Sequence, residues 1–110
     1  MSALSENLKN LRLLHGYSVK YVAEKLSRVP NTVTNWEKGT ISPPVDDVEV
    51  LCKLYNVSPN QIFGWDKCQE LEDFLNKKKE ILKRVEDLQY QKAAIERELR
   101  EYNDMLNRGN

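Results

Sequence analysis

The stretch VPNTVTNWEKG, residues Val29 to Gly39, places two apolar side chains among a run of short polar ones. Val33 and Trp36 are three residues apart, so on a helix they share one face, which we expect to be turned into a core. Asn and Thr surround them, although both are mediocre helix formers because their side chains compete for local backbone hydrogen bonds. Such residues suit a helix whose polar face is used by a ligand; an ordinary solvated face is the alternative.

Two helices are predicted before this one. The first has leucines at the helical period and ends at Gly16, a usual C-terminal residue; the leucines are Leu4, Leu8, Leu11 and Leu14. Ser18 is a good N-cap for the second helix, whose apolar positions are Val19, Val22, Ala23 and Leu26. Pro30 fits the first turn of the third helix, and Gly39 ends it.

Two short helices are predicted after it. A Pro-Pro break precedes the fourth helix, whose apolar face is Val45, Val48, Leu51, Cys52 and Leu54. Ser58 caps a short fifth helix, with Pro59 in its first turn. Because every connection is short, we expect an all-α domain of five packed helices over residues 1–66.

The turn between the second and third helices has about three residues, which is the helix-turn-helix arrangement. In that arrangement the second helix of the pair lies in the DNA major groove, where Asn can pair with adenine and a Thr methyl can contact thymine. The predicted base contacts are Asn31, Thr32, Thr34 and Asn35. The predicted contacts to the DNA backbone are Ser18, Lys20, Arg28, Lys38 and Thr40.

Residues 4–64 resemble the phage-repressor/Cro type of helix-turn-helix domain, also called the xenobiotic-response-element family. The similarity lies in LKNLRLLHGYS, VAEKLS, TVTNWEKG and LCKLYNVSPNQIF, which follow in the family's order and spacing. The resemblance implies a sequence-specific DNA-binding transcriptional regulator of phage or bacterial origin, most often a repressor. It also implies a structural ion pair between Arg12 and Glu37, because many members pair these two positions.

The chain departs from this family at the turn. Ser27 stands where the family usually has Gly, so we expect a less relaxed backbone there. The next two residues, Arg28 and Val29, leave the third helix without its usual N-cap. Val19 also replaces a glutamine that often contacts DNA, so we expect modest affinity for each domain and a need for dimerisation.

From about Lys67 the composition changes, since Gly and Pro are absent until Gly109. Apolar residues alternate there by three and four, the a/d pattern of a coiled coil, which predicts a dimerisation helix over residues 67–108. The predicted contacts are Leu71, Phe74, Ile81, Val85, Leu88, Ile95, Leu99, Tyr102 and Leu106. Lys78 and Lys92 occupy two a positions and favour two strands. The charge pairs expected across the seam are mostly absent, so strand orientation is left open. Two domains on one DNA site fit the parallel form best. The alternative to a coiled coil is a long helix that folds back on its own domain.

Composition sets limits on function. Lys plus Arg total 17 and Asp plus Glu total 17, so the chain is not an indiscriminate nucleic-acid binder and DNA contacts must rest on local placement. We expect no enzyme, metal, cofactor or small-molecule ligand, because no catalytic constellation is present and Cys52, Cys68 and His15 lack zinc spacing. No apolar run could cross a membrane and no secretory signal is recognised, so a cytoplasmic protein at the nucleoid is expected.

The main hypothesis is a repressor that binds a near-palindromic operator as a homodimer. Its half-sites should lie about 34 Å apart or a multiple of that. Control should come from antagonist proteins that compete for the coiled coil, or from protein concentration. The second hypothesis is an interaction adaptor whose DNA binding is weak or lost.

Overall fold

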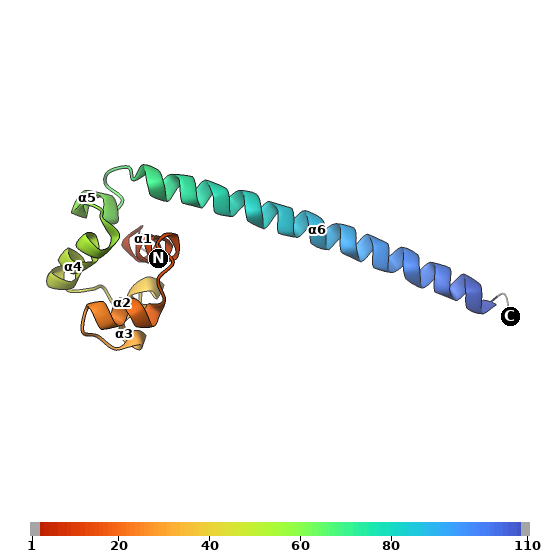
Figure 1. Cartoon of the computed structure of the whole chain (residues 1–110), viewed down its shortest axis with the longest axis horizontal. Coiled ribbons are helices and arrows are strands. Elements are labelled where there is room, and N and C mark those ends of the chain that lie inside the picture. The colour runs from red at the N-terminus through yellow and green to blue at the C-terminus, as the bar shows by residue number, and fades with distance from the viewer. Residues whose placement is uncertain (1–2, 109–110) are drawn as a thin grey trace. The chain divides into compact units, whose positions relative to one another are not determined.

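The computed structural model describes residues 3–108, in which six helices are joined by short loops and no strand is present (Figure 1). The helices are α1 (Ala3–Leu14), α2 (Val19–Lys25), α3 (Pro30–Lys38), α4 (Val45–Tyr55), α5 (Pro59–Ile62) and α6 (Gln69–Arg108). The predicted fold class, five short helices followed by one long helix, is therefore confirmed. Residues 1 and 2 of the predicted first domain lie outside the described residues.

The helix ends follow from the residues that stand there. Ser18 Oγ accepts a hydrogen bond from the Tyr21 N–H at 3.0 Å, which satisfies a free donor at the start of α2. Gly39 adopts the left-handed conformation that ends α3. Helix α3 begins without a side-chain cap, as the residues before it predict, since Val29 stands at the N-cap position.

The turn between α2 and α3 has the strained backbone expected from its sequence. Ser27 lies at φ +55°, in the left-handed region that glycine enters without cost. The Arg28 N–H donates back to the Ala23 carbonyl at 2.8 Å, so the turn wraps closely around the end of α2.

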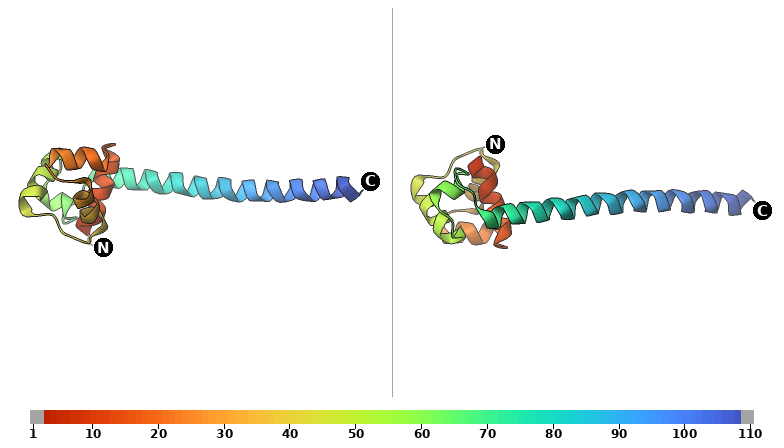
Figure 2. Two further views of the ribbon diagram at one scale, coloured as in Figure 1. Left: turned by 90° about the horizontal axis from the view of Figure 1, so that it is seen from below. Right: turned by 90° about the horizontal axis from the view of Figure 1, so that it is seen from above.

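Helices α1 to α5 enclose one core (Figures 1 and 2). Helix α3 packs against α1 and α2, and α5 against α1 and α4. The buried apolar side chains are Leu8, Leu11, Val22, Ala23, Leu26, Val33, Trp36, Val48, Leu51, Cys52, Tyr55, Ile62 and Leu71. Burial raises the pKa of the Cys52 thiol, because the charged form would lose its hydration.

Leu71, predicted as a dimer contact, lies in this core and is only 6% exposed, so its side chain is already covered by its own chain. Phe74 and Leu75 are half-buried, and Leu75 packs against the same core. The compact unit accordingly runs on to Leu75, past the division expected after Asp66. A leucine at a heptad position is stabilised equally well by a core of its own chain, and here that core is adjacent.

Helix α6 is one unbroken helix of 40 residues, about 60 Å long at about 1.5 Å per residue. Beyond Leu75 the apolar side chains at the heptad positions of α6 are exposed. We call this set of residues the α6 stripe: Ile81, Val85, Leu88, Ile95, Leu99, Tyr102 and Leu106. Among residues 3–108, no helix has the length and hydropathy needed to span a bilayer.

Candidate nucleic-acid interface

Helix α3 is anchored by Val33 and Trp36, which are 2% and 3% exposed. Because successive residues of a helix are rotated by about 100°, this buried face leaves Asn31, Asn35 and Lys38 on the opposite side. Thr32 and Thr34 fall on the two flanks between these faces and are half-buried. The outward face of α3 is therefore narrower than the four predicted base contacts suggested.

The four predicted base contacts differ in their freedom to meet a ligand. Asn31 is exposed, whereas Asn35 is half-buried. The chain after α3 returns to the last turn, and the Thr40 N–H donates to the Asn35 carbonyl at 3.1 Å. The Thr34 hydroxyl donates to the Pro30 carbonyl at 3.2 Å, which leaves its oxygen lone pairs and its methyl group for a partner.

A charged pair fixes α3 against α1. Arg12 Nε donates to Glu37 Oε2 at 2.8 Å, and Nη2 donates to Oε1 at 3.1 Å. Arg12 Nη1 also donates to the Tyr17 carbonyl at 3.0 Å, so one guanidinium connects α1, α3 and the loop before α2. The structure thus brings together the two residues that the family resemblance pairs. Both are largely buried, and removing either would leave the other charge uncompensated.

Tyr55 of α4 packs behind this pair and is 2% exposed. Burial raises the pKa of its phenol above the usual range, and the nearby Glu37 carboxylate raises it further. Tyr55 therefore stays uncharged at physiological pH and adds no competing charge beneath α3.

All five predicted DNA-backbone contacts lie on the surface, namely Ser18, Lys20, Arg28, Lys38 and Thr40. Ser18 is also engaged as the cap of α2, but its hydroxyl proton remains available as a donor.

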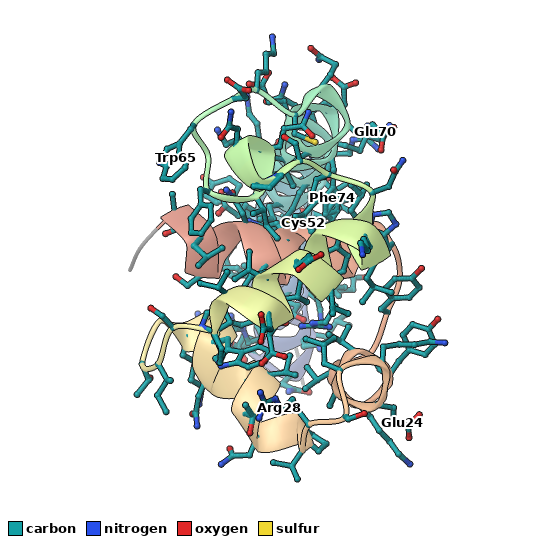
Figure 3. All side chains as sticks on the ribbon, turned by 90° about the vertical axis from the view of Figure 1, so that its left-hand side faces the viewer. Glu24, Arg28, Cys52, Trp65, Glu70 and Phe74 are labelled. Carbon is teal, nitrogen blue, oxygen red and sulfur yellow. The ribbon has the colours of Figure 1, made fainter. Side chains whose placement is uncertain are left out.

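Arg28, the fifth, is engaged with α4. Its Nη2 lies 2.8 Å from Asp47 Oδ2, and its Nε donates to the same oxygen at 3.1 Å. Figure 3 shows Arg28 at the end of the domain formed by α2 and α3. The Asp47 side chain is 11% exposed and that of Arg28 is 44% exposed. The structure thus gives Arg28 a positioning contact that sequence reasoning missed, because Asp47 is 19 residues away and no local pattern links the two.

Two further surface residues were not selected from the sequence. Val29, at the start of α3, is 63% exposed and offers an apolar contact beside Asn31. The rings of Tyr21 and Tyr17 are tilted by 36° to each other with centroids 4.6 Å apart, and Lys25 Nζ lies 5.3 Å from the Tyr21 ring centroid. Tyr21 and Lys25 are four residues apart on α2, a spacing that predicts such a cation–π contact.

Among the residues that the structure describes, no group of three or more His, Cys, Asp and Glu side chains could hold a metal ion. Cys52 and Cys68 are both free thiols.

Comparison with known proteins gives a consistent result. The model of the helix-turn-helix family matches residues 8–62, half of the chain. The chain is 36% identical over 77 residues to the HTH-type transcriptional regulator ImmR of Bacillus subtilis, in an alignment covering 68% of this chain and 61% of that protein. It is 32% identical over 82 residues to the antitoxin PezA of Streptococcus pneumoniae, covering 73% of this chain and 52% of that protein.

A third relative, named as the uncharacterized HTH-type transcriptional regulator YobD of Bacillus subtilis, is 30% identical over 59 residues, covering 54% of this chain and 53% of that protein. The chain thus spans between about half and three fifths of the length of these curated relatives. No solved structure matches the chain.

Proposed function

The chain belongs to the phage-repressor/Cro type of the helix-turn-helix family, and from this premise we propose that it is a sequence-specific DNA-binding transcriptional regulator, acting as a repressor. Two of its relatives are named as HTH-type transcriptional regulators. As a DNA-binding regulator it would work in the cytoplasm, at the nucleoid.

The observation that carries this proposal is the construction of α3. Two buried side chains and the Arg12–Glu37 pair fix the helix, while Asn31 and Asn35 stand one turn apart on its outward face. Asparagine amides on a rigid helix can pair with the N6 and N7 edge of adenine in the major groove. Lys20 and Lys38 would then contact phosphates on either side.

We further propose that two chains bind together. The α6 stripe is an unpartnered apolar surface, and a second copy would bury it. Net charge is zero, so a single domain should bind DNA weakly, whereas two linked domains gain affinity through effective concentration. A two-fold symmetric dimer matches a near-palindromic operator.

Selection of bound sequences from a random DNA pool would identify the operator, after which the reading helix can be tested. The double change Asn31→Ala and Asn35→Ala should weaken operator binding by about 30-fold or more, because each bidentate base contact contributes about 1–3 kcal/mol. Asn76→Ala, at an exposed asparagine of α6, is the matched control and should leave affinity unchanged. Equal binding by the parent and the double variant would show that α3 does not read the operator.

A second candidate function is a protein-interaction adaptor that works through α6. It is favoured by the exposed α6 stripe, and one relative is named as an antitoxin. A gel shift against genomic fragments at low and moderate salt separates the two, since a pure adaptor would form no saturable complex with DNA. A partner protein that competes for the stripe is also the proposed route of control.

A further inference from the structure

Two charged residues occupy a positions of the heptad: Lys78, just before the α6 stripe, and Lys92, within it. We propose that a second copy of the chain covers the stripe in antiparallel orientation. The centre of the pairing is level with Tyr90, so that each seam residue faces the one equally far on the other side of that position. This inference rests on the dimer proposed above and specifies its geometry.

The two lysines argue against a parallel pair. In parallel coiled coils each a residue faces its own copy, so Lys78 would meet Lys78 and Lys92 would meet Lys92, and like charges in contact are destabilising. In the antiparallel pair an a residue faces a d residue. Lys92 then faces the partner's Leu88, and Lys78 faces the partner's Tyr102.

The remaining layers of the antiparallel pair are apolar, with Val85 facing the partner's Ile95 and Leu99 facing the partner's Ile81. Lys92 Nζ lies 3.9 Å from Glu96 Oε1, one turn further along the same helix. Its charge is thus directed to the edge of the stripe, while its methylene stem can cover the seam.

Charges on the flanks favour the same orientation. Arg84, Gln91 and Glu98 lie along one flank of the α6 stripe, and in the antiparallel pair this flank lies against the same flank of the partner. Arg84 then faces the partner's Glu98. The two-fold symmetry produces this contact twice. The other residues of this flank bring no like charges together. Lys77 faces the partner's Met105, and Gln91 faces the partner's Gln91. In a parallel pair Arg84 would face Gln89 and Glu98 would face Asn103, so neither charge would find an opposite one.

The domain core limits the register. A shift of one heptad towards the N-terminus would place Tyr102 against the partner's Leu71, which is buried in its own domain and unavailable. A shift in the other direction would place Arg84 against Met105 and would lose the Arg84–Glu98 contacts. The pairing centred on Tyr90 keeps the Arg84–Glu98 contacts and needs no seam contact from the buried Leu71.

This geometry sets the distance between the points at which the two α6 helices leave their DNA-binding units. Asn76 and the partner's Asn76 would lie about 28 residues apart along the coil, or about 42 Å at about 1.5 Å per residue. In a parallel pair the same two residues would be only about 10 Å apart, the spacing of neighbouring helix axes. One turn of DNA separates half-sites by about 34 Å, so the antiparallel coil spans a distance of the same order.

Cysteine cross-linking in the full chain tests orientation and register together. In a Cys68→Ser background, the double variant Val85→Cys/Ile95→Cys should form a covalent dimer under mild oxidation, because these positions face each other in the antiparallel pair. Each single variant should stay uncross-linked, since identical positions would lie about 15 Å apart along the coil. Cross-linking by Val85→Cys alone would indicate a parallel coil and overturn the proposal. A dimer by sedimentation in which no variant cross-links would overturn this register, and a monomer would overturn the proposed dimer itself.

A charge-exchange series gives an independent readout in the uncross-linked chain. Arg84→Glu and Glu98→Arg should each weaken self-association by about tenfold, since two attractive contacts become two repulsive ones, and the combined variant should restore it. Lys83→Glu, next to Arg84 but away from the seam, is the control and should have no such effect. A combined variant no better than the single ones would contradict the Arg84–Glu98 pairing.

Discussion

Arg28 can hold the turn before α3 or contact a DNA phosphate, and its partner Asp47 distinguishes the two roles. The carboxylate keeps the guanidinium against α4, at 2.8 Å from Nη2. The turn also carries a residue at positive φ and leads into a helix with no side-chain cap. We therefore expect the ion pair to provide the restraint that a cap would otherwise give.

The change Asp47→Asn tests this role. If Arg28 positions the turn, the variant should bind the operator more weakly, with an unchanged dependence of affinity on salt, and should lose about 1 kcal/mol of stability because Arg28 is partly exposed. If Arg28 instead contacts a phosphate, releasing it should strengthen binding and steepen the salt dependence. Fluorescence anisotropy at several salt concentrations measures both quantities. Asp46→Asn, an exposed neighbour with the same charge change, controls for the general loss of negative charge.

Ser27 is the second residue at which the turn can be tested. Its φ of +55° is costly for a residue with a Cβ, so Ser27→Gly should raise the free energy of unfolding by about 0.5–1 kcal/mol. Urea unfolding followed by the fluorescence of buried Trp36 measures this change. Ser27→Ala keeps the Cβ and should bring no gain; equal stabilisation by both variants would show that the backbone conformation is not the cause.

The helices themselves could be predicted from the sequence because their signals are local. Leucine spacing, the Ser18 cap and the glycine at the end of α3 each act within one or two turns of chain. The same reasoning could not separate Leu71 from the later seam residues, since a heptad position is apolar whether it faces its own core or a second chain. It also missed Asp47, because contacts between distant elements leave no pattern in a single sequence. The half-burial of Thr32 and Thr34, by contrast, follows from helix rotation and could have been predicted.

The boundary between the compact unit and the exposed part of α6 leads to a prediction at the level of elements. A chain ending after Asn76 should keep the stability of the DNA-binding unit, because Leu71 and Leu75 still pack on the core. A chain ending after Asp66 should be less stable by about 2–3 kcal/mol, since it loses the buried Leu71. Thermal unfolding followed by circular dichroism compares the two. Equal stability would show that the first turns of α6 contribute nothing to the core.

For the whole molecule, the balance of charge makes assembly the main source of affinity. Basic and acidic residues are equal in number, so long-range attraction to DNA is weak and the contacts of one domain are few. The proposed coil would therefore determine both how tightly and over what spacing the protein binds.

Changing the distance between half-sites tests this dependence. Inserting 5 base pairs turns one half-site to the opposite side of the duplex, so the second domain of a coil-linked dimer should disengage and affinity should fall by about 100-fold. Inserting 10 base pairs returns the half-site to the original side of the duplex, so affinity should fall less than with 5 base pairs. A Leu88→Asp/Ile95→Asp chain, whose stripe can no longer pair, should bind weakly and equally to all three operators, whereas Tyr90→Asp, at an exposed residue outside the stripe, should behave like the parent. Anisotropy titrations at one fixed salt concentration give these affinities. If the parent chain binds all three operators equally tightly, each domain must act alone, and the coil must have some role other than setting half-site spacing.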